Sequence, residues 1–342
     1  MSDTTEQVTR TALGLLRAAG AAGTAERRVG EAVLDVLHSD PAVCASAWDV
    51  VEPLGGRVRT VCVRGYRAGV SSFLRSPAFL ADDDGYRLLR EQPDHPARSW
   101  SDVDGYETGP SVTRVFRPGG YTGGATLRLT TPDGRYVGNV HLSTAGGRSP
   151  SSELMGALNL AAGTLATLLD PSRRLDAVAD GIAGPMSDRA RAALLGADGV
   201  VAPLPGRTPP PAPVLAAAAT AGPGAHRALL GGRWHLVRLV PVAAGVLVLV
   251  SEEDLPADVT ARELDVLTHV VAGRTNRATA RRLGIAERTV AHHLENVTAR
   301  LGASSRAAVA ALAVAEGLRR LPADQGAGTS DTRGTRPSTT SC

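Results

Sequence analysis

The chain has 342 residues, 43% of them hydrophobic, so it is long enough to bury sizeable cores and to form two or three domains. No N-terminal stretch combines a basic region with an apolar one, and no apolar run approaches the ~20 residues that span a bilayer. We therefore expect a cytoplasmic protein with no membrane partner, and the net charge of +3 is too small to identify a polyanionic partner by itself.

Residues 1–171 have the pattern of an α+β domain. Helices are predicted over 6–38, with a break near Gly20 to Gly23, and again from a cap at Ser149 to Pro171. Strands are predicted at 43–51, 57–65, 111–116, 125–130 and 136–143. The run GRYVGNVHLST with the helix SPSSELMGALNLAAGTLATLLD resembles a GAF domain, over about half of the domain. The resemblance implies a sensor.

Aromatic side chains concentrate in this domain, where ten of the eleven lie between Trp48 and Tyr136. They could line a ligand pocket or simply form the largest core, and the sequence leaves both interpretations open. The long segment from Ser71 to Asp104 could cover such a pocket. The candidate pocket residues are Trp48, Tyr66, Phe73, Trp100, Tyr106, Phe116 and Tyr121.

The sequence predicts no catalytic site and no metal site. The acidic run Asp82 to Asp84 is typical of a solvated loop, and His95 and His141 have no Cys or Ser at a telling spacing. No glycine-rich phosphate loop with its Lys occurs, because the chain contains no Lys, so no cofactor is expected. Cys44 and Cys62 lie on adjacent predicted strands, where two small core residues are favoured over a redox pair.

Residues 172–255 form a second, weaker unit. A helix is expected near 175–182 and an Ala-rich stretch follows at 214–221. The sequence RWHLVRLVPVAAGVLVLVSEE predicts two strands that turn at Ala243 to Gly245, while the Pro-rich run at 208–213 predicts an extended connector. The unit is vaguely similar to a truncated PAS-type module, so a degenerate PAS-like module or a connector is expected.

Residues 256–320 predict an all-α domain of four short helices. Thr260 and Glu263 form a capping box for a helix that ends at Gly273, and a second helix runs from Asn276 to Leu283. The third, from about 287 to 301, carries one apolar stripe, and a fourth begins after Ser304. Apolar residues vanish after Arg320, so 321–342 is predicted to be disordered.

The second and third helices match a helix-turn-helix, because they are short and are joined by a turn that contains Gly. The later of the two also carries polar residues on the side opposite its apolar stripe. The spaced residues resemble the LuxR-type family. They are Thr260, Glu263, Val266, Leu267, Gly273, Asn276, Ala280, Leu283, Thr289, Val290, His293, Leu301, Gly302, Ser305 and Arg306. The chain departs from the family at Ala278 and Thr279, which thins the apolar packing, and at Ala291, where a basic residue is usual.

The resemblance implies which residues meet DNA. Base-edge positions fall at Ala291, His292 and Glu295, so the operator should differ from the usual one. The phosphate candidates are Thr275, Asn276, Arg277, Arg281, Arg282, Arg288, Thr289, Arg300 and Arg306. His293 is expected to pack half-buried, and no metal pair with His292 is predicted because adjacent helical residues diverge.

The interpretation is a cytoplasmic transcription regulator, not an enzyme, whose sensor responds to an unidentified signal. Double-stranded DNA, RNA polymerase, a second copy of the chain and a small molecule in the sensor are the partners it implies. The apolar stripes at 24–38 and 150–169 could pair two copies, or leave Leu158 and Leu165 as core within one domain. Two alternatives remain: an N-terminal module that binds protein or dimerises without a ligand, and an enzyme with an appended DNA-binding domain.

Overall fold

The computed structural model describes residues 2–21, 26–184 and 190–323. The chain divides into two compact units, Met1–Val178 and Ala179–Cys342. Most of the expected helix break near 20–23 lies outside the described residues, and so do residues 324–342 of the predicted disordered tail, 321–342.

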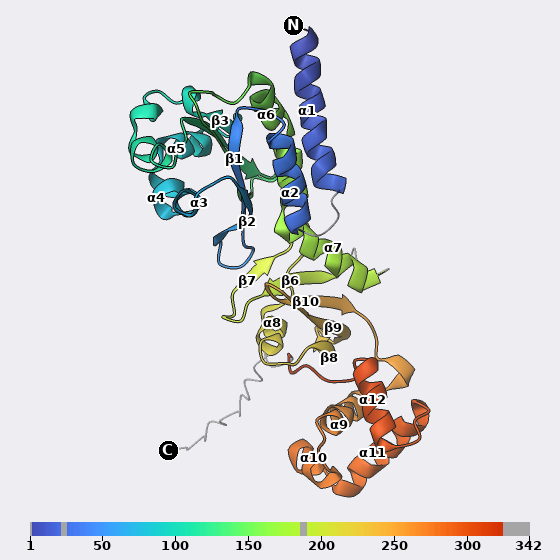
Figure 1. Ribbon diagram of the computed structural model, residues 1–342. Coiled ribbons are helices and arrows are strands. Elements are labelled where there is room, and N and C mark those ends of the chain that lie inside the picture. Colours follow the sequence, from blue (N-terminus) through green and yellow to red (C-terminus); the bar gives the residue numbers. More distant parts are fainter. Residues whose placement is uncertain (1, 22–25, 185–189, 324–342) are drawn as a thin grey trace, which may run out of the picture. The chain divides into compact units, whose positions relative to one another are not determined.

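The first unit is built on one antiparallel sheet (Figure 1). Its strands, from edge to edge, are β2 (Val58–Arg64), β1 (Val43–Val51), β5 (Tyr136–Thr144), β4 (Gly123–Thr130) and β3 (Ala97–Ser99). Four of the predicted strands are confirmed, and β3 was not predicted.

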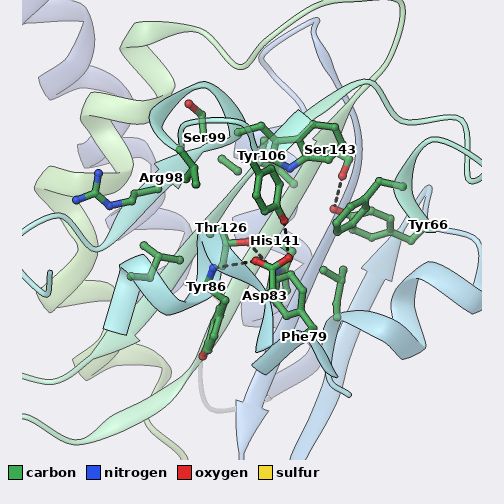
Figure 2. A pocket seen from close by; sticks show the side chains of 18 residues that line it. Tyr66, Phe79, Asp83, Tyr86, Arg98, Ser99, Tyr106, Thr126, His141 and Ser143 are labelled. Carbon is green, nitrogen blue, oxygen red and sulfur yellow. Dashed lines mark hydrogen bonds between the residues drawn. The ribbon is translucent and has the colours of Figure 1, made fainter. Parts of the chain in front are cut away.

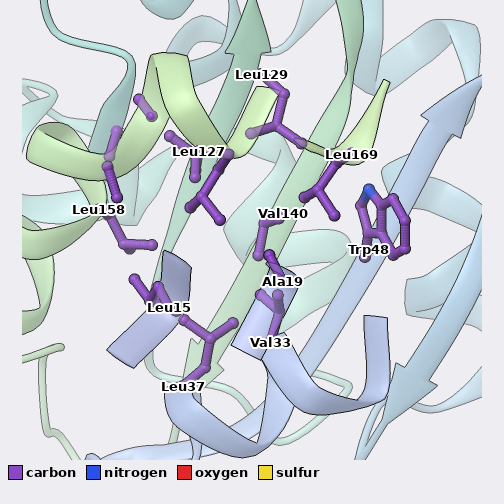
Figure 3. Packing of buried hydrophobic residues seen from close by; sticks show 14 of the residues in the cluster. Leu15, Ala19, Val33, Leu37, Trp48, Leu127, Leu129, Val140, Leu158 and Leu169 are labelled. Carbon is purple, nitrogen blue, oxygen red and sulfur yellow. The ribbon is translucent and has the colours of Figure 1, made fainter. Parts of the chain in front are cut away.

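Long helices cover one face of this sheet (Figure 3). They are α1 (Ser2–Ala21), α2 (Glu26–Leu37) and α6 (Ser152–Leu169), whose N-cap is Ser151 and not Ser149. Leu158 and Leu165 are buried here, as core within the unit. Among the described helices, α6 alone is long and apolar enough to cross a membrane, but it packs on the sheet as a core helix does.

Trp48 belongs to this helix-covered core, which corrects its assignment to the pocket. Strand side chains alternate between faces, so Trp48 lies opposite the face of its neighbour Asp49. Its side chain is fully buried, and a Cβ added at Gly30 of α2 would lie 2.5 Å from it and from Cys62 Sγ. Cys62 pairs in register with Trp48 and is buried, whereas Cys44 is exposed, and both thiols are free.

Short helices cover the other face of the sheet. They are α3 (Ala68–Leu74), α4 (Pro77–Asp82) and α5 (Asp84–Glu91), followed by the turns η1 (Trp100–Asp102), η2 (Tyr106–Thr108) and η3 (Val112–Phe116). The strand predicted at 111–116 is wrong, since η3 is a π-helical turn. Val112 and Phe116 are buried in the same cluster, and their spacing of four residues is compatible with a helical turn and with a strand. Pro110 and Pro118 flank the segment and have no backbone N–H, which disfavours strand pairing there.

The second unit contains a sheet of its own. Its strands, from edge to edge, are β7 (Val201–Pro203), β6 (Arg191–Leu195), β10 (Gly245–Glu252), β9 (Arg233–Val242) and β8 (Gly224–Leu230). The strands β9 and β10 confirm the predicted pair, while β6 to β8 were not predicted. The helix α8 (Ala212–Ala218) belongs to this unit, whereas α7 (Pro171–Ala183) spans the boundary between the two units. The two sheets have the same strand order: when the five strands of each are numbered along the chain, their order across the sheet is 2-1-5-4-3.

The helical part of the second unit confirms the predicted four helices (Figure 1). They follow the turn η5 (Pro256–Asp258) and are α9 (Ala261–Val271), α10 (Asn276–Leu283), α11 (Glu287–Arg300) and α12 (Arg306–Ala315). Val290 and Val297 of α11 are fully buried, in the predicted stripe. The ordered chain extends past 320, because Leu321 and Ala323 are buried against the sheet and not part of a disordered tail.

Candidate nucleic-acid interface and aromatic cavity

A small cavity lies between the first sheet and the helices α4 and α5 (Figure 2). Its volume is about 20 Å³, room for about one water molecule. Four of the predicted pocket residues line it, namely Tyr66, Trp100, Tyr106 and Phe116. Phe73 and Tyr121 pack in the same aromatic cluster outside the lining, so the structure brings together six of the seven and leaves out Trp48.

Asp83 is a buried acid in the cavity wall, not part of a solvated loop. Its carboxylate caps α5 by accepting the Tyr86 N–H at 2.9 Å, and it accepts the Tyr106 hydroxyl at 2.8 Å. Asp82 and Asp84 on either side are exposed. Burial, with the neighbouring Asp83 charge, raises the pKa of the Tyr106 phenol, so Tyr106 remains a hydrogen-bond donor.

A second buried acid, Asp49, faces the same side of the sheet. Its Oδ2 lies 3.5 Å from His141 Nε2, and both side chains are 1% exposed. The other ring nitrogen of His141 is 3.0 Å from Thr126 Oγ1, and Asp49 Oδ1 accepts the Thr60 hydroxyl. The sequence left His141 as an ordinary surface or core residue without a partner, because Asp49 is distant in sequence and only the β1–β5 register brings the two strands together.

The wall therefore mixes aromatic rings with fixed polar groups. The Tyr66 hydroxyl is 2.8 Å from Ser143 Oγ, and burial raises the pKa of Tyr66. Within the described chain, His141 Nε2 is a buried nitrogen without a hydrogen bond of normal geometry. Such a wall suits a small ligand that is largely apolar and carries a few hydrogen-bonding groups.

The helical domain of the second unit is fixed by its first cap. Thr260 caps α9, and its backbone N–H donates to Glu263 Oε2 at 2.9 Å, which completes the capping box. Glu263 also accepts hydrogen bonds from the two terminal guanidinium nitrogens of Arg300, at 2.7 and 2.9 Å. Burial raises the pKa of Glu263, but the Thr260 hydrogen bonds and the Arg300 charge outweigh it and hold that pKa below its usual value.

The third helix presents a polar face. Its buried stripe leaves Arg288, Thr289, His292 and Glu295 exposed along α11. His292 Nε2 lies 3.3 Å from Asn296 Nδ2, one turn further along. A helix of this kind, held over α10 by the turn at Gly284, has the shape that enters the DNA major groove.

A comparison with protein-family models decides the identity of this part. Residues 257–313 match the model described as "Bacterial regulatory proteins, luxR family". Residues 257–313 form a LuxR-family DNA-binding domain. The chain is thus a DNA-binding regulator, as its motif predicted.

Most phosphate candidates lie on the exposed surface of the LuxR-family domain. Thr275, Arg277, Arg281, Arg282, Arg288 and Thr289 are exposed, and Asn276 is half-buried. Of the base-edge candidates, His292 and Glu295 are exposed, whereas Ala291 is half-buried. His293 is half-buried too.

Two of the phosphate candidates have partners inside the domain. Arg300 is bound to Glu263 and donates to the Asp258 carbonyl at 2.7 Å, so a contact with phosphate would have to compete with this pair. Sequence reasoning missed this pair because it joins the start of α9 to the end of α11. Arg306 donates to Asn276 Oδ1 at 2.9 Å and to the Arg274 carbonyl, so it ties α12 to the helix-turn-helix.

Solved structures give distant likenesses. Escherichia coli SdiA is 17% identical over 85% of this chain and 91% of its own, with a TM-score of 0.34. The LBD domain of VqsR from Pseudomonas aeruginosa is 12% identical over 46% of this chain and 94% of its own, with a TM-score of 0.34. A phage VqmA–DPO complex is 21% identical over 25% of this chain and 50% of its own, with a TM-score of 0.18. These scores support no functional argument, and curated protein sequences gave no match.

Proposed function

We propose that the protein is a cytoplasmic, sequence-specific transcription regulator that places α11 in the major groove of duplex DNA. The exposed polar face of α11, inside a LuxR-family domain, is the observation that carries this proposal. RNA polymerase is the partner that such a regulator would recruit or block. As part of this proposal, the chain acts as a regulator and not as an enzyme.

Reading and positioning are assigned to different residues of the interface. Arg282 lies exposed at the end of α10 and is proposed to contact phosphate, whereas Glu295 lies on the free face of α11 and is proposed to accept from a cytosine amino group. The R282A variant should weaken binding to all duplexes and lower the salt slope by about one unit. The E295A variant should relax preference at one base pair, by about 1–3 kcal/mol.

A selection from randomised duplexes, run on the wild type and both variants, tests this assignment. R233A serves as the control, since Arg233 is exposed and pairs with Glu252 in the second sheet. The assignment is reversed if R282A changes the selected base while E295A does not. The proposed function itself fails if the wild-type chain shows no preference for duplex DNA at low salt.

We further propose that two copies pair through α6. Its outer face carries Leu160, Thr164 and Leu168, one turn apart, with Leu160 63% and Leu168 38% exposed. No charged residue follows Glu153 in this helix. A two-fold axis at Thr164 would place Leu160 of one copy on Leu168 of the other, a self-complementary contact. A second copy is the favoured occupant because paired half-sites need paired helix-turn-helix domains.

Light scattering of the L160D variant tests the pairing. A charge in an apolar contact is costly, so L160D should be monomeric where the wild type is dimeric. L13D is the control, because Leu13 of α1 is also 45% exposed but lies outside the proposed contact. A wild type that stays monomeric, free and on DNA, would contradict the proposal.

For the first unit we propose a GAF-like sensor whose cavity holds the signal. The aromatic wall with Asp83 and His141 supports a small ligand, yet the cavity now has room for about one water molecule, so binding must move α4 and α5 outward. The second sheet is proposed as a degenerate PAS-like module. Because the cavity is so small, it equally favours the alternative, in which the first unit is an interaction domain without a ligand.

A thermal-shift screen of small metabolites separates the two. A ligand present at 100 times its Kd raises the stability of the folded state by about 2.7 kcal/mol. The shift should disappear in Y106F, which loses the hydrogen bond to Asp83, and persist in F73L, which changes a residue outside the lining. Shifts that are equal in both variants would place the ligand outside this cavity, and the absence of any shift across the screen would favour the interaction domain.

A further inference from the structure

The segment that follows α12 leaves the LuxR-family domain and returns to the second sheet. We name residues Leu318–Ala323 the C-terminal strap. Leu318 is fully buried in the helical core, while Leu321 and Ala323 are buried in the core of the sheet. The strap therefore contributes apolar side chains to both parts of the second unit.

The backbone of the strap pairs with the free edge of β8. The Arg227 N–H donates to the Arg319 carbonyl at 2.7 Å, and the Leu321 N–H donates to the Arg227 carbonyl at 2.8 Å. These two bonds form a parallel bridge between Arg227 and Arg320. An edge strand presents unpaired N–H and C=O groups that accept an extended chain, and here the strap occupies that position.

The two arginines of the strap bind different parts of the second unit, Arg319 the sheet and Arg320 the first helix of the LuxR-family domain. Arg319 donates to the Ala225 carbonyl at 3.1 Å, on β8. Arg320 donates to Asp265 Oδ1 of α9 at 2.8 Å, and its backbone N–H donates to Thr268 Oγ1 at 2.8 Å. The Arg320 guanidinium also lies 5.5 Å from the ring centre of Trp234, a residue of β9.

The segment that enters the LuxR-family domain from β10 is also bound to β8. Arg227 is 2% exposed and donates to Glu253 Oε1 at 2.9 Å and to the Asp254 carbonyl at 3.2 Å. The Glu253 N–H donates to the Trp234 carbonyl at 3.1 Å. Independent domains are normally joined by exposed linkers with few contacts, whereas here both the entry and the exit of the LuxR-family domain are bound to β8 and β9.

We propose that the edge of β8 is a docking surface for the C-terminal strap, and that this docking joins the LuxR-family domain and the second sheet into one rigid body. The DNA-reading helix is then oriented by the sheet and not by a flexible linker. The docking lies within the second unit, so its loss can be measured without DNA.

Native-state hydrogen exchange of the full chain in low denaturant tests the docking. In the wild type, amides of α9 and β9 should lose protection at the same denaturant concentration, since one body opens as one unit. The L321D variant puts a charge into the sheet core and should speed exchange at least tenfold in peptides covering 318–323 and 224–230. In P322A, which changes an exposed residue of the strap, exchange should match the wild type.

Two results would overturn the proposal. One is rapid, unprotected exchange of residues 318–323 in the wild type. The other is unchanged exchange of 224–230 in L321D. If L321D also unfolds the helices, R320A decides, because it keeps Leu321 and removes the side-chain bond to Asp265 and the contact with Trp234. Tenfold faster exchange within 318–323 in R320A then supports the strap, and no acceleration contradicts it.

Discussion

The two sheets of this chain share one strand order and use their faces differently. The first carries three long helices on one face and an aromatic layer on the other, with buried acids at Asp49 and Asp83. The second has one aromatic, Trp234, and its apolar face is filled by α8 and by the C-terminal strap. The same strand order therefore supports two different arrangements. The elements packed on the sheet decide whether a face encloses a small cavity, as in the first unit, or packs against the C-terminal strap, as in the second.

The largest expected effect concerns the two tryptophans. Replacement of fully buried Trp48 by Ala should cost about 3–5 kcal/mol, because it leaves a large cavity in a packed core. The W234A variant should cost less, since Trp234 is only half-buried. Urea unfolding of both variants measures the difference, and a loss below about 1 kcal/mol in W48A would contradict the placement of Trp48.

The next effect separates an ion pair from a DNA contact. Arg300 is 36% exposed, so R300A should cost about 1–3 kcal/mol, less than the 3–5 kcal/mol of a fully buried pair. The pKa of Glu263 is lowered in the folded state, so its contribution to stability is full above the unfolded pKa and is lost as the pH falls through the folded pKa. Wild type and R300A should therefore converge in stability in acid. A variant that binds DNA weakly but unfolds like the wild type would restore Arg300 to the phosphate contacts.

Two threonines, one inside α10 and one at its N-cap, give a smaller, matched pair. Thr279 is fully buried, and within the described chain its hydroxyl has no hydrogen-bond partner. T279V should stabilise the LuxR-family domain by about 1 kcal/mol, because the unsatisfied hydroxyl is removed. T275V should destabilise it by about 1 kcal/mol, because Thr275 Oγ1 caps α10 through the Ala278 N–H. Thermal unfolding of both variants measures the two signs, and a T279V variant that unfolds earlier than the wild type would refute the first.

The smallest effect is a pH dependence at β8. Burial lowers the pKa of His226, whose Nε2 lies 2.9 Å from the Gly222 carbonyl. The unfolded chain then takes up a proton that the folded chain does not, so stability falls as the pH drops below about 6.5. Hydrogen exchange of β8 between pH 7 and 5 should show this loss, and H226Q should reduce it. A loss of equal size in H226Q would assign the effect to other groups.

Sequence prediction succeeded where local chemistry decides the structure. The LuxR-family helices were predicted nearly to the residue, because caps such as Thr260 and stops such as Gly284 act within one turn. The strands β9 and β10 followed from a long apolar pair around a tight turn. The strand β6, which pairs with β10, and the strand β7, which pairs with β6, are short and have no comparable turn pattern.

Prediction failed where long-range pairing decides. The face on which Trp48 lies depends on the register of β1 between β2 and β5, and a shift of one residue would reverse it. The partner of His141 and the partner of Arg300 are likewise set by elements far apart in the chain. The exposed positions of Arg282 and Glu295 could be predicted, because one buried stripe fixes the free face of a helix.

Glu263 has a consequence for how the LuxR-family domain opens. The same carboxylate closes the capping box at the start of α9 and holds Arg300 at the end of α11. Neither helix end can fray alone, because release of the carboxylate costs the cap and the ion pair together. The domain should therefore open as a single cooperative unit, with the first turn of one helix and the last turn of another exchanging their amides at the same rate.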